Sequence, residues 1–130
     1  MDTSNKPQTV TTPEAPKAIG PYSQAAIAGG LLFISGQLPI DPATSEFPSG
    51  GIQARTHQCL QNLRAIAQAA GTDLDRAVKV NVYLTDMQDF EAVNQVYSQY
   101  FPDDPPARLA IQVAGLPKKA DIEIEAVLSL

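Results

Sequence analysis

The sequence has few of the residues that bind metal ions or carry out thiol chemistry. Its 130 residues include one cysteine, one histidine and no tryptophan. Because Cys59 is alone, it can form neither an internal disulfide nor a cysteine-based metal cluster. His57 lies two positions earlier in the same predicted helix, where roughly 200° around the axis separates the two side chains, so they do not form a catalytic pair. The acidic pairs elsewhere lack the further ligands that a metal ion needs, and we expect no metal site.

Positive charge is scarce as well. The chain has 9 Lys and Arg residues against 14 Asp and Glu residues, which gives a formal net charge of −5 and a pI near 4.6. The basic residues are spread along the chain, so we expect no basic surface that would attract phosphate backbones or anionic lipids. Neither nucleic acid nor a membrane is an expected partner.

The chain has no long hydrophobic run. Its longest apolar stretch, residues 25–34, is interrupted by Gly29-Gly30 and would span only about half a bilayer. Residues 1–17 show neither the hydrophobic segment of a signal peptide nor the Arg-rich pattern of a transit peptide. We therefore expect a cytoplasmic protein.

A single domain, residues 1–130, accounts for the chain. Its length is ordinary for one domain, and its 44% of hydrophobic residues can bury a core without disulfides. Residues 1–15 are expected to form a flexible segment or to contribute an edge strand near residues 9–12. Organised structure is expected to begin near Ala18.

Two extended apolar runs flank Gly29-Gly30, and this pattern is a strong hairpin signal. If Ala28 pairs with Leu31, the register places Tyr22 opposite Gln37. One face of the hairpin is then expected to carry Tyr22, Gln24, Ala26, Leu31, Phe33 and Ser35.

The remaining elements follow from hydrophobic periodicity. Helical spacing predicts helices over residues 52–70, with Gly71 as C-cap glycine, and over residues 90–101, with Asp89 as N-cap. Alternation predicts strands over residues 77–86, 107–114 and 122–128. One face of the first of these strands is expected to carry its apolar residues, Val78, Val80, Val82 and Leu84.

This order of strands and helices predicts an α+β fold, a mixed sheet with both helices on one face. Two helices cannot cover both faces of such a sheet. The opposite face, with Tyr22, Phe33 and Tyr83, is too apolar to meet water, so we expect another copy of the chain to cover it.

Two charged residues interrupt the apolar strands near the C-terminus. Arg108 alternates with Leu109 and Ile111, and Glu123 alternates with its isoleucine neighbours. Both are therefore expected to point to the face that carries Tyr22 and Ser35. A guanidinium suits bidentate recognition of a carboxylate, and a nearby carboxylate can orient or deprotonate water. The pattern indicates a small-molecule site at a subunit seam.

A purely structural interpretation stays open beside this one. Arg108 and Glu123 can form an interface ion pair, with Glu125 solvated, and on spacing alone such pairs are the more common case. Tyr22 is then an interface contact, and Ser35 simply ends a strand.

Five short motifs carry a resemblance to a known family. They are "AIGPYSQA" (18–25), "ISGQLP" (34–39), "VNQVYSQYF" (93–101), "PPAR" (105–108) and "IEIEA" (122–126). Together, and in this order, they resemble the reactive intermediate deaminase family, of the enamine/imine deaminase A type. The resemblance runs from about residue 16 to the C-terminus.

The resemblance implies a bacillus-type chorismate-mutase-like fold assembled as a homotrimer, with active sites in the clefts between subunits. It implies the activity of a 2-iminobutanoate/2-iminopropanoate deaminase without metal or cofactor. Such enzymes hydrolyse reactive enamines and imines, released by pyridoxal-phosphate-dependent dehydratases, to 2-keto acids and ammonia. The small-molecule partner would be the imine or the 2-keto acid.

The resemblance also implies residue roles. Arg108 would bind the substrate carboxylate, and Glu123 would position or activate the attacking water. Tyr22, Ser35 and Gly36 would line the pocket.

Two further positions come from the same motifs. Asn94 matches a family position near the site. Many members read Arg-Ser-Cys where this chain reads Arg108-Leu109-Ala110, so no thiol is present there, and contacts at Ala110 are expected to come from its backbone.

Two other functions compete with the deaminase. The same cleft can serve a non-catalytic trimer that binds a 2-keto acid and regulates another protein. An endoribonuclease or translation inhibitor is the third candidate, and the acidic balance, the single histidine and the missing basic stripe weigh against it.

Overall fold

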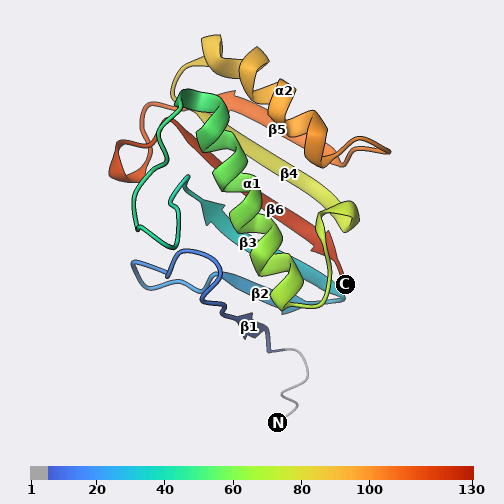
Figure 1. Ribbon diagram of the computed structural model, residues 1–130. Helices are drawn as coiled ribbons and strands as arrows, with labels where there is room; N and C mark the ends of the chain where they lie inside the picture. The colour runs from blue at the N-terminus through green and yellow to red at the C-terminus, as the bar shows by residue number, and fades with distance from the viewer. Residues whose placement is uncertain (1–5) are drawn as a thin grey trace.

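The fold is a six-stranded sheet with two α-helices on one face (Figure 1). The computed structural model describes residues 6–130. The strands are β1 (Gln8–Val10), β2 (Ala25–Ala28), β3 (Leu31–Gln37), β4 (Ala77–Leu84), β5 (Ala107–Gln112) and β6 (Ile122–Ser129), and the helices are α1 (Gly51–Ala69) and α2 (Phe90–Tyr100). Single 3₁₀ turns cover Leu74–Arg76, Met87–Asp89 and Pro117–Lys119. The predicted α+β sheet with two helices is confirmed.

The strands follow the order β1-β2-β3-β6-β4-β5, so β1 and β5 lie at the two edges. All neighbouring strands are antiparallel except β4 and β5, which are parallel and joined through α2. The predicted N-terminal edge strand is present as β1, and the part of that prediction that concerns residues 1–5 lies outside the described residues.

The hairpin of β2 and β3 has the predicted register, with Ala28 paired to Leu31. Gly29 and Gly30 have φ angles of 61° and 76°. Two consecutive residues with positive φ form the tight turn that matches strand twist, and glycine adopts this conformation without the steric cost of a Cβ.

A β-bulge at the end of β3 changes the predicted facing of its last residues. Ile34 pairs with Ala126, but Gln37 pairs with Ile124, so β3 has one more residue than β6 in this interval. The extra residue turns Gln37 to the helix side, where it is buried. The prediction that Tyr22 and Gln37 share a face is therefore wrong.

A register shift between Ala77 and Lys79 similarly displaces Val78 on β4. Its neighbours Val80 and Val82 are fully buried as predicted, but Val78 is 48% exposed. Its predicted place on the apolar face is wrong, because alternation holds only where the ladder keeps its register.

The main core lies between the sheet and the two helices. Its most deeply buried large side chains come from β3, β4, β6, α1 and α2, and they include Leu32, Val80, Ile122, Ile124, Leu128, Leu60, Leu63, Ile66 and Val93.

The ends of the two helices were also predicted. Gly71 follows α1 with a φ of 88°, which confirms the predicted C-cap glycine. Asp89 stands at the predicted N-cap position of α2, but its side chain makes no capping hydrogen bond, whereas the side chain of Asp86 caps the preceding 3₁₀ turn. No helix within residues 6–130 is long and apolar enough to cross a membrane.

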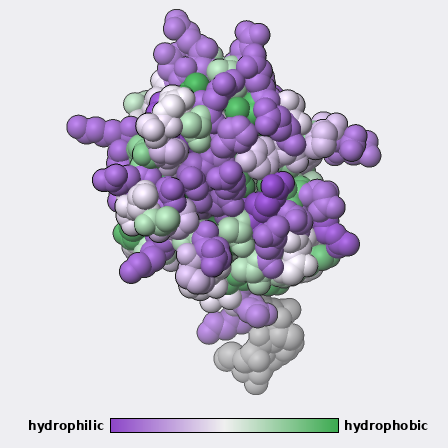
Figure 2. Space-filling view, viewed as in Figure 1, coloured by the Kyte–Doolittle hydropathy of each residue, from purple (hydrophilic) through white to green (hydrophobic). Residues whose placement is uncertain are grey.

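The two faces of the molecule differ in polarity. The helix side, shown in Figure 2, is largely hydrophilic. On the opposite side of the sheet, called here the open face, no helix of residues 6–130 is packed. Phe33, Leu109 and Ile111 stand on it and are 46%, 42% and 38% exposed. No other part of residues 6–130 fully covers these apolar side chains.

The buried amide of Gln24 attaches residues 12–16 to the hairpin. Its oxygen accepts the Thr12 N–H at 2.7 Å, and its NH₂ group donates to the carbonyls of Thr12 at 3.1 Å, Ala15 at 3.4 Å and Pro16 at 2.8 Å. Four bonds from one buried side chain satisfy backbone groups that have no strand partner.

Replacing Gln24 with Ala leaves these backbone groups unsatisfied. We expect the free energy of unfolding to fall by about 1–3 kcal/mol, measured by denaturant unfolding at one fixed protein concentration. Gln99→Ala, at an exposed position of α2, serves as the control and should change it by less than about 0.5 kcal/mol. Equal stability of the two variants would show that the Gln24 network is not structural.

Candidate active site

A cavity of about 410 Å³ on the open face contains four of the predicted site residues, Tyr22, Ser35, Gly36 and Glu123. The other lining residues are Ile19, Leu38, Pro117 and Glu125. The sequence predicted these four residues on three separate motifs, and the structure brings them together. We call this group the Glu123 half-site.

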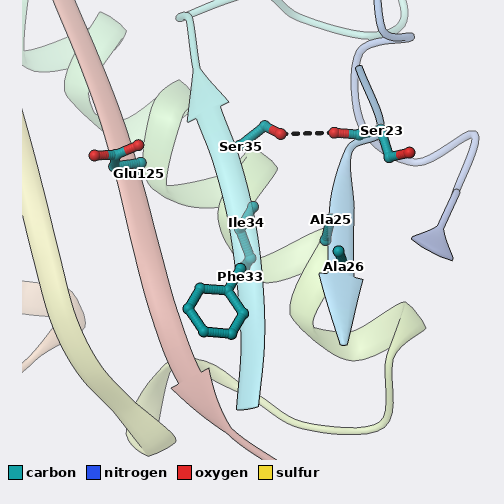
Figure 3. Close-up of a pocket in the computed structure, with 7 residues that line it drawn as sticks. All are labelled: Ser23, Ala25, Ala26, Phe33, Ile34, Ser35 and Glu125. Carbon is teal, nitrogen blue, oxygen red and sulfur yellow. Dashed lines mark hydrogen bonds between the residues drawn. The ribbon is translucent and has the colours of Figure 1, made fainter. Parts of the chain in front are cut away.

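Neighbouring strands position the half-site. Ser35 and Gly36 occupy the bulge of β3, and Glu123 extends from β6, the next strand in the sheet. The Ser35 hydroxyl donates to the Ser23 carbonyl at 2.6 Å, which fixes its orientation. Figure 3 shows the adjoining cavity, where Phe33, Ser35 and Glu125 stand on the same side of β3 and β6.

Gly36 leaves the space in which the Glu123 carboxylate lies. A Cβ atom at position 36 would be 2.7 Å from Glu123 Oε2 and 2.9 Å from its Cδ. Real Cβ contacts are not this short, so any side chain here would push the carboxylate away. The glycine is therefore needed for close approach and not for an unusual backbone angle.

Partial burial makes Glu123 a better proton acceptor than a free glutamate. Desolvation raises its pKa, and the negative charge of Glu125 raises it further. A carboxyl group with a raised pKa can take a proton from water and return it within one reaction cycle.

Glu125 is held by side chains of β4. Its Oε1 accepts the Tyr83 hydroxyl at 2.6 Å and the Asn81 NH₂ group at 3.0 Å. The hydrogen bond to Glu125, with burial as a smaller cause, raises the pKa of Tyr83 to about 12, so the phenol stays a donor. The alternative in which Glu125 is merely solvated is wrong. The alternation of β4 placed Tyr83 on this face, and the same pattern could have identified Asn81.

Arg108 lies elsewhere. It pairs with the buried Val80 across the parallel ladder and points to the helix side. There its Nη1 donates to Asn94 Oδ1 at 2.6 Å, and its guanidinium lies 5.3 Å and 4.9 Å from the ring centroids of Phe90 and Tyr97. We call this group the Arg108 half-site.

The prediction that Arg108 and Glu123 share a face is therefore wrong. Leu109 and Ile111 were expected to face the core because they are apolar, but in register with β4 they face the open side. Glu123 pairs with Tyr83 on that open side, so the two charged residues lie on opposite faces of the sheet. They form no ion pair within the chain.

One more residue, Ala110, completes the Arg108 half-site. Ala110 pairs with Val82, and its side chain packs on the core, which leaves its backbone as the group to contact a ligand. From the sequence, Phe90 and Tyr97 were predicted only as part of the helix over residues 90–101. The Tyr97 hydroxyl is buried and has no hydrogen-bond partner within residues 6–130.

The arrangement thus provides a proton acceptor in one half-site and a fixed cation in the other. Within residues 6–130 no group of three or more metal-ligating side chains is placed to hold a metal ion. The chemistry that these side chains themselves can perform is binding of an anion and transfer of a proton.

Comparison with known proteins gives a consistent result. Residues 12–129 match the family model described as endoribonuclease L-PSP. The RutC family protein y4sK of Sinorhizobium fredii is 56% identical, with 93% of this chain and 96% of that protein covered. The human 2-iminobutanoate/2-iminopropanoate deaminase is 48% identical, with 91% and 86% covered.

A solved structure extends the likeness to the fold. The crystal structure of RidA from the Antarctic bacterium Psychrobacter sp. PAMC 21119 superimposes with a TM-score of 0.91 at 46% identity, and 95% of this chain and 99% of that chain are covered. Sequence and fold therefore agree over nearly the whole length, and the chain belongs to the reactive intermediate deaminase (Rid) family, whose model is described as endoribonuclease L-PSP.

Proposed function

We propose that the protein is a cytoplasmic 2-iminobutanoate/2-iminopropanoate deaminase that removes reactive by-products of pyridoxal-phosphate-dependent dehydratases. The half-buried Glu123, held against Gly36 in a cavity with Tyr22 and Ser35, is the observation that carries the proposal. Relatives at about 48% identity that are named for this activity support it.

The reaction needs one base and no covalent intermediate. Glu123 takes a proton from water as the water oxygen attacks the imine carbon, and protonated Glu123 then gives this proton to the imine nitrogen. The resulting carbinolamine loses ammonia when Glu123 moves the hydroxyl proton to the nitrogen, so that one imine and one water give one 2-keto acid and one ammonia, with Glu123 again ionised. Because an imine is already electrophilic, positioning and proton transfer supply the main catalytic effect.

A homotrimer would unite the two half-sites. Within one chain Arg108 and Glu123 lie on opposite faces, and the apolar Phe33, Leu109 and Ile111 on the open face lack a cover. We infer that subunits pack through this face in a chorismate-mutase-like trimer, so that Arg108 of one subunit approaches Glu123 of the next. Asn94 orients the guanidinium, which binds the substrate carboxylate through two parallel hydrogen bonds.

Ribonuclease activity is the second candidate because the matched family model is described as an endoribonuclease. The net charge of −5 gives little attraction for RNA. The only histidine, His57, contacts the Tyr100 hydroxyl at 3.0 Å between the two helices, on the other side of the sheet from the cavity. RNA cleavage that survives repurification and is lost in Glu123→Gln would favour this candidate.

Arg108→Ala removes the proposed carboxylate anchor. We expect kcat/KM for an imine generated in situ by a dehydratase to fall at least about 100-fold. Arg108→Lys should recover part of the loss, because it keeps the charge without the fork.

Arg76→Ala, an exposed arginine of a 3₁₀ turn, is the matched control and should keep full activity. The assay follows release of the 2-keto acid. If the wild-type protein binds a 2-keto acid but does not accelerate its release from the imine, the regulatory trimer becomes the favoured function in place of the enzyme.

Gly36→Ala should displace the Glu123 carboxylate without unfolding the sheet. We expect kcat to fall by about 10–100-fold, because a displacement near 1 Å at a catalytic group has effects of this order. Gly115→Ala is the control, since a Cβ there meets no atom within 4 Å. Added to Glu123→Gln, Gly36→Ala should cause no further loss, and additive losses would contradict the role given to the glycine.

Mixed trimers test whether the site is shared. Arg108→Ala and Glu123→Gln, each inactive alone, are co-expressed with different tags. Every mixed trimer then holds one intact site, so a random mixture should show about a quarter of wild-type activity. Glu123→Gln co-expressed with Gly36→Ala is the control and should show no gain over the average activity of the two variants alone, because both changes lie in the same half-site. Mixed trimers that recover no activity would refute a site built from two subunits.

A further inference from the structure

Two carboxylates stand side by side on the open face, and the proposed mechanism uses only one of them. Ile122, Ile124 and Ala126 of β6 are buried on the helix side, so Glu123 and Glu125 both point the other way. Residues two apart on a strand are about 7 Å apart. Both side chains line the same cavity.

Their hydrogen bonds are unequal. Tyr83 lies directly opposite Glu123 in the ladder, yet its hydroxyl donates at 2.6 Å to Glu125, the diagonal neighbour. Asn81, opposite Glu125, donates to the same oxygen. Within residues 6–130 no hydrogen bond reaches the Glu123 carboxylate, so one member of the pair is fixed by two donors and the other is free to react.

We propose that Glu125 is an electrostatic positioning residue: its carboxylate, held beside Glu123 by Tyr83 and Asn81, determines the pH range in which Glu123 acts as the base. Pairs of carboxyl groups in unequal surroundings separate into a fixed charge and a proton carrier. The fixed charge of Glu125 disfavours a second negative charge on Glu123, which therefore keeps a proton to higher pH than it would alone.

The other titratable groups near the pair do not replace the effect of Glu125 on the pKa of Glu123. Tyr22 shares the cavity with Glu123. Burial raises the pKa of Cys59 in α1, and the negative charge of Glu123 raises it further. Lys79 of β4 borders a neighbouring cavity with Glu125, but it pairs with Val127, beyond Glu125 as seen from Glu123. In the proposed trimer, Arg108 of the next subunit also faces Glu123 and acts in the opposite direction.

The kinetic test of this inference rests on the proposed deaminase function. Glu125→Gln removes the charge and keeps the shape. If Glu123 must be ionised to act as base, the acid limb of the kcat/KM profile should move to lower pH by about half a unit or more. Glu125→Asp keeps the charge and should stay near the wild-type profile. Glu91→Gln, on the exposed side of α2, is the matched control and should leave the profile in place.

A titration without substrate separates the two proposals. The ¹³C carboxyl signal of Glu123, assigned with Glu123→Gln, is followed against pH in wild-type and Glu125→Gln protein. A lower midpoint in the variant supports the inference even if the wild-type protein hydrolyses no imine, a result that would reject the deaminase alone.

An unchanged midpoint overturns the inference, whatever the activity. If Glu125→Gln fails to fold because the new amide NH₂ group lies against the donors Tyr83 and Asn81, the double variant Glu125→Ala/Tyr83→Phe removes the charge and the Tyr83 donor together and should show the same downward shift. No shift in the folded double variant would also overturn it.

Discussion

The candidate site depends on the alternation of β6, an inner strand of the sheet. Because Ile122 and Ile124 are fully buried against the helices, Glu123 and Glu125 must extend from the other face. A slip of one residue would place both carboxylates in the core, where an unpaired charge is very costly. The hydrophobic core therefore holds the acidic pair in place, and no flexible loop has to position the proposed base.

The bulge in β3 adds the second part of that site. It places Ser35 and Gly36 beside β6, and the missing side chain of Gly36 lets the Glu123 carboxylate lie close to the backbone. The hairpin, its register and the end of α1 could be predicted because each depends on neighbouring residues in the sequence. The bulge could not, because an extra residue is defined only by comparing two strands that are far apart in the chain.

Arg108 shows a second limit of sequence reasoning. The alternation of β5 was predicted correctly, but its apolar side was assigned to the core. At this edge strand the parallel register with β4 directs Leu109 and Ile111 to the open face, although they are apolar. Hydrophobicity alone does not distinguish the core of the chain from a surface that another chain covers. The family motifs identified Arg108 and Asn94 in one half-site and Tyr22, Ser35, Gly36 and Glu123 in the other, but only the register separated the two groups.

The separation has a chemical consequence in the proposed trimer. In an isolated subunit, Glu123 lies beside the charge of Glu125 and on the other face of the sheet from Arg108. The pKa of Glu123 is therefore higher there than in the assembly. Assembly brings in Arg108 of the next subunit, which favours ionised Glu123. A substrate carboxylate bound to that arginine then offsets much of its charge. In the complex that reacts, burial and the fixed charge of Glu125 remain as the causes that raise the pKa of Glu123, so the hydrogen bonds from Tyr83 and Asn81 matter most when substrate is bound.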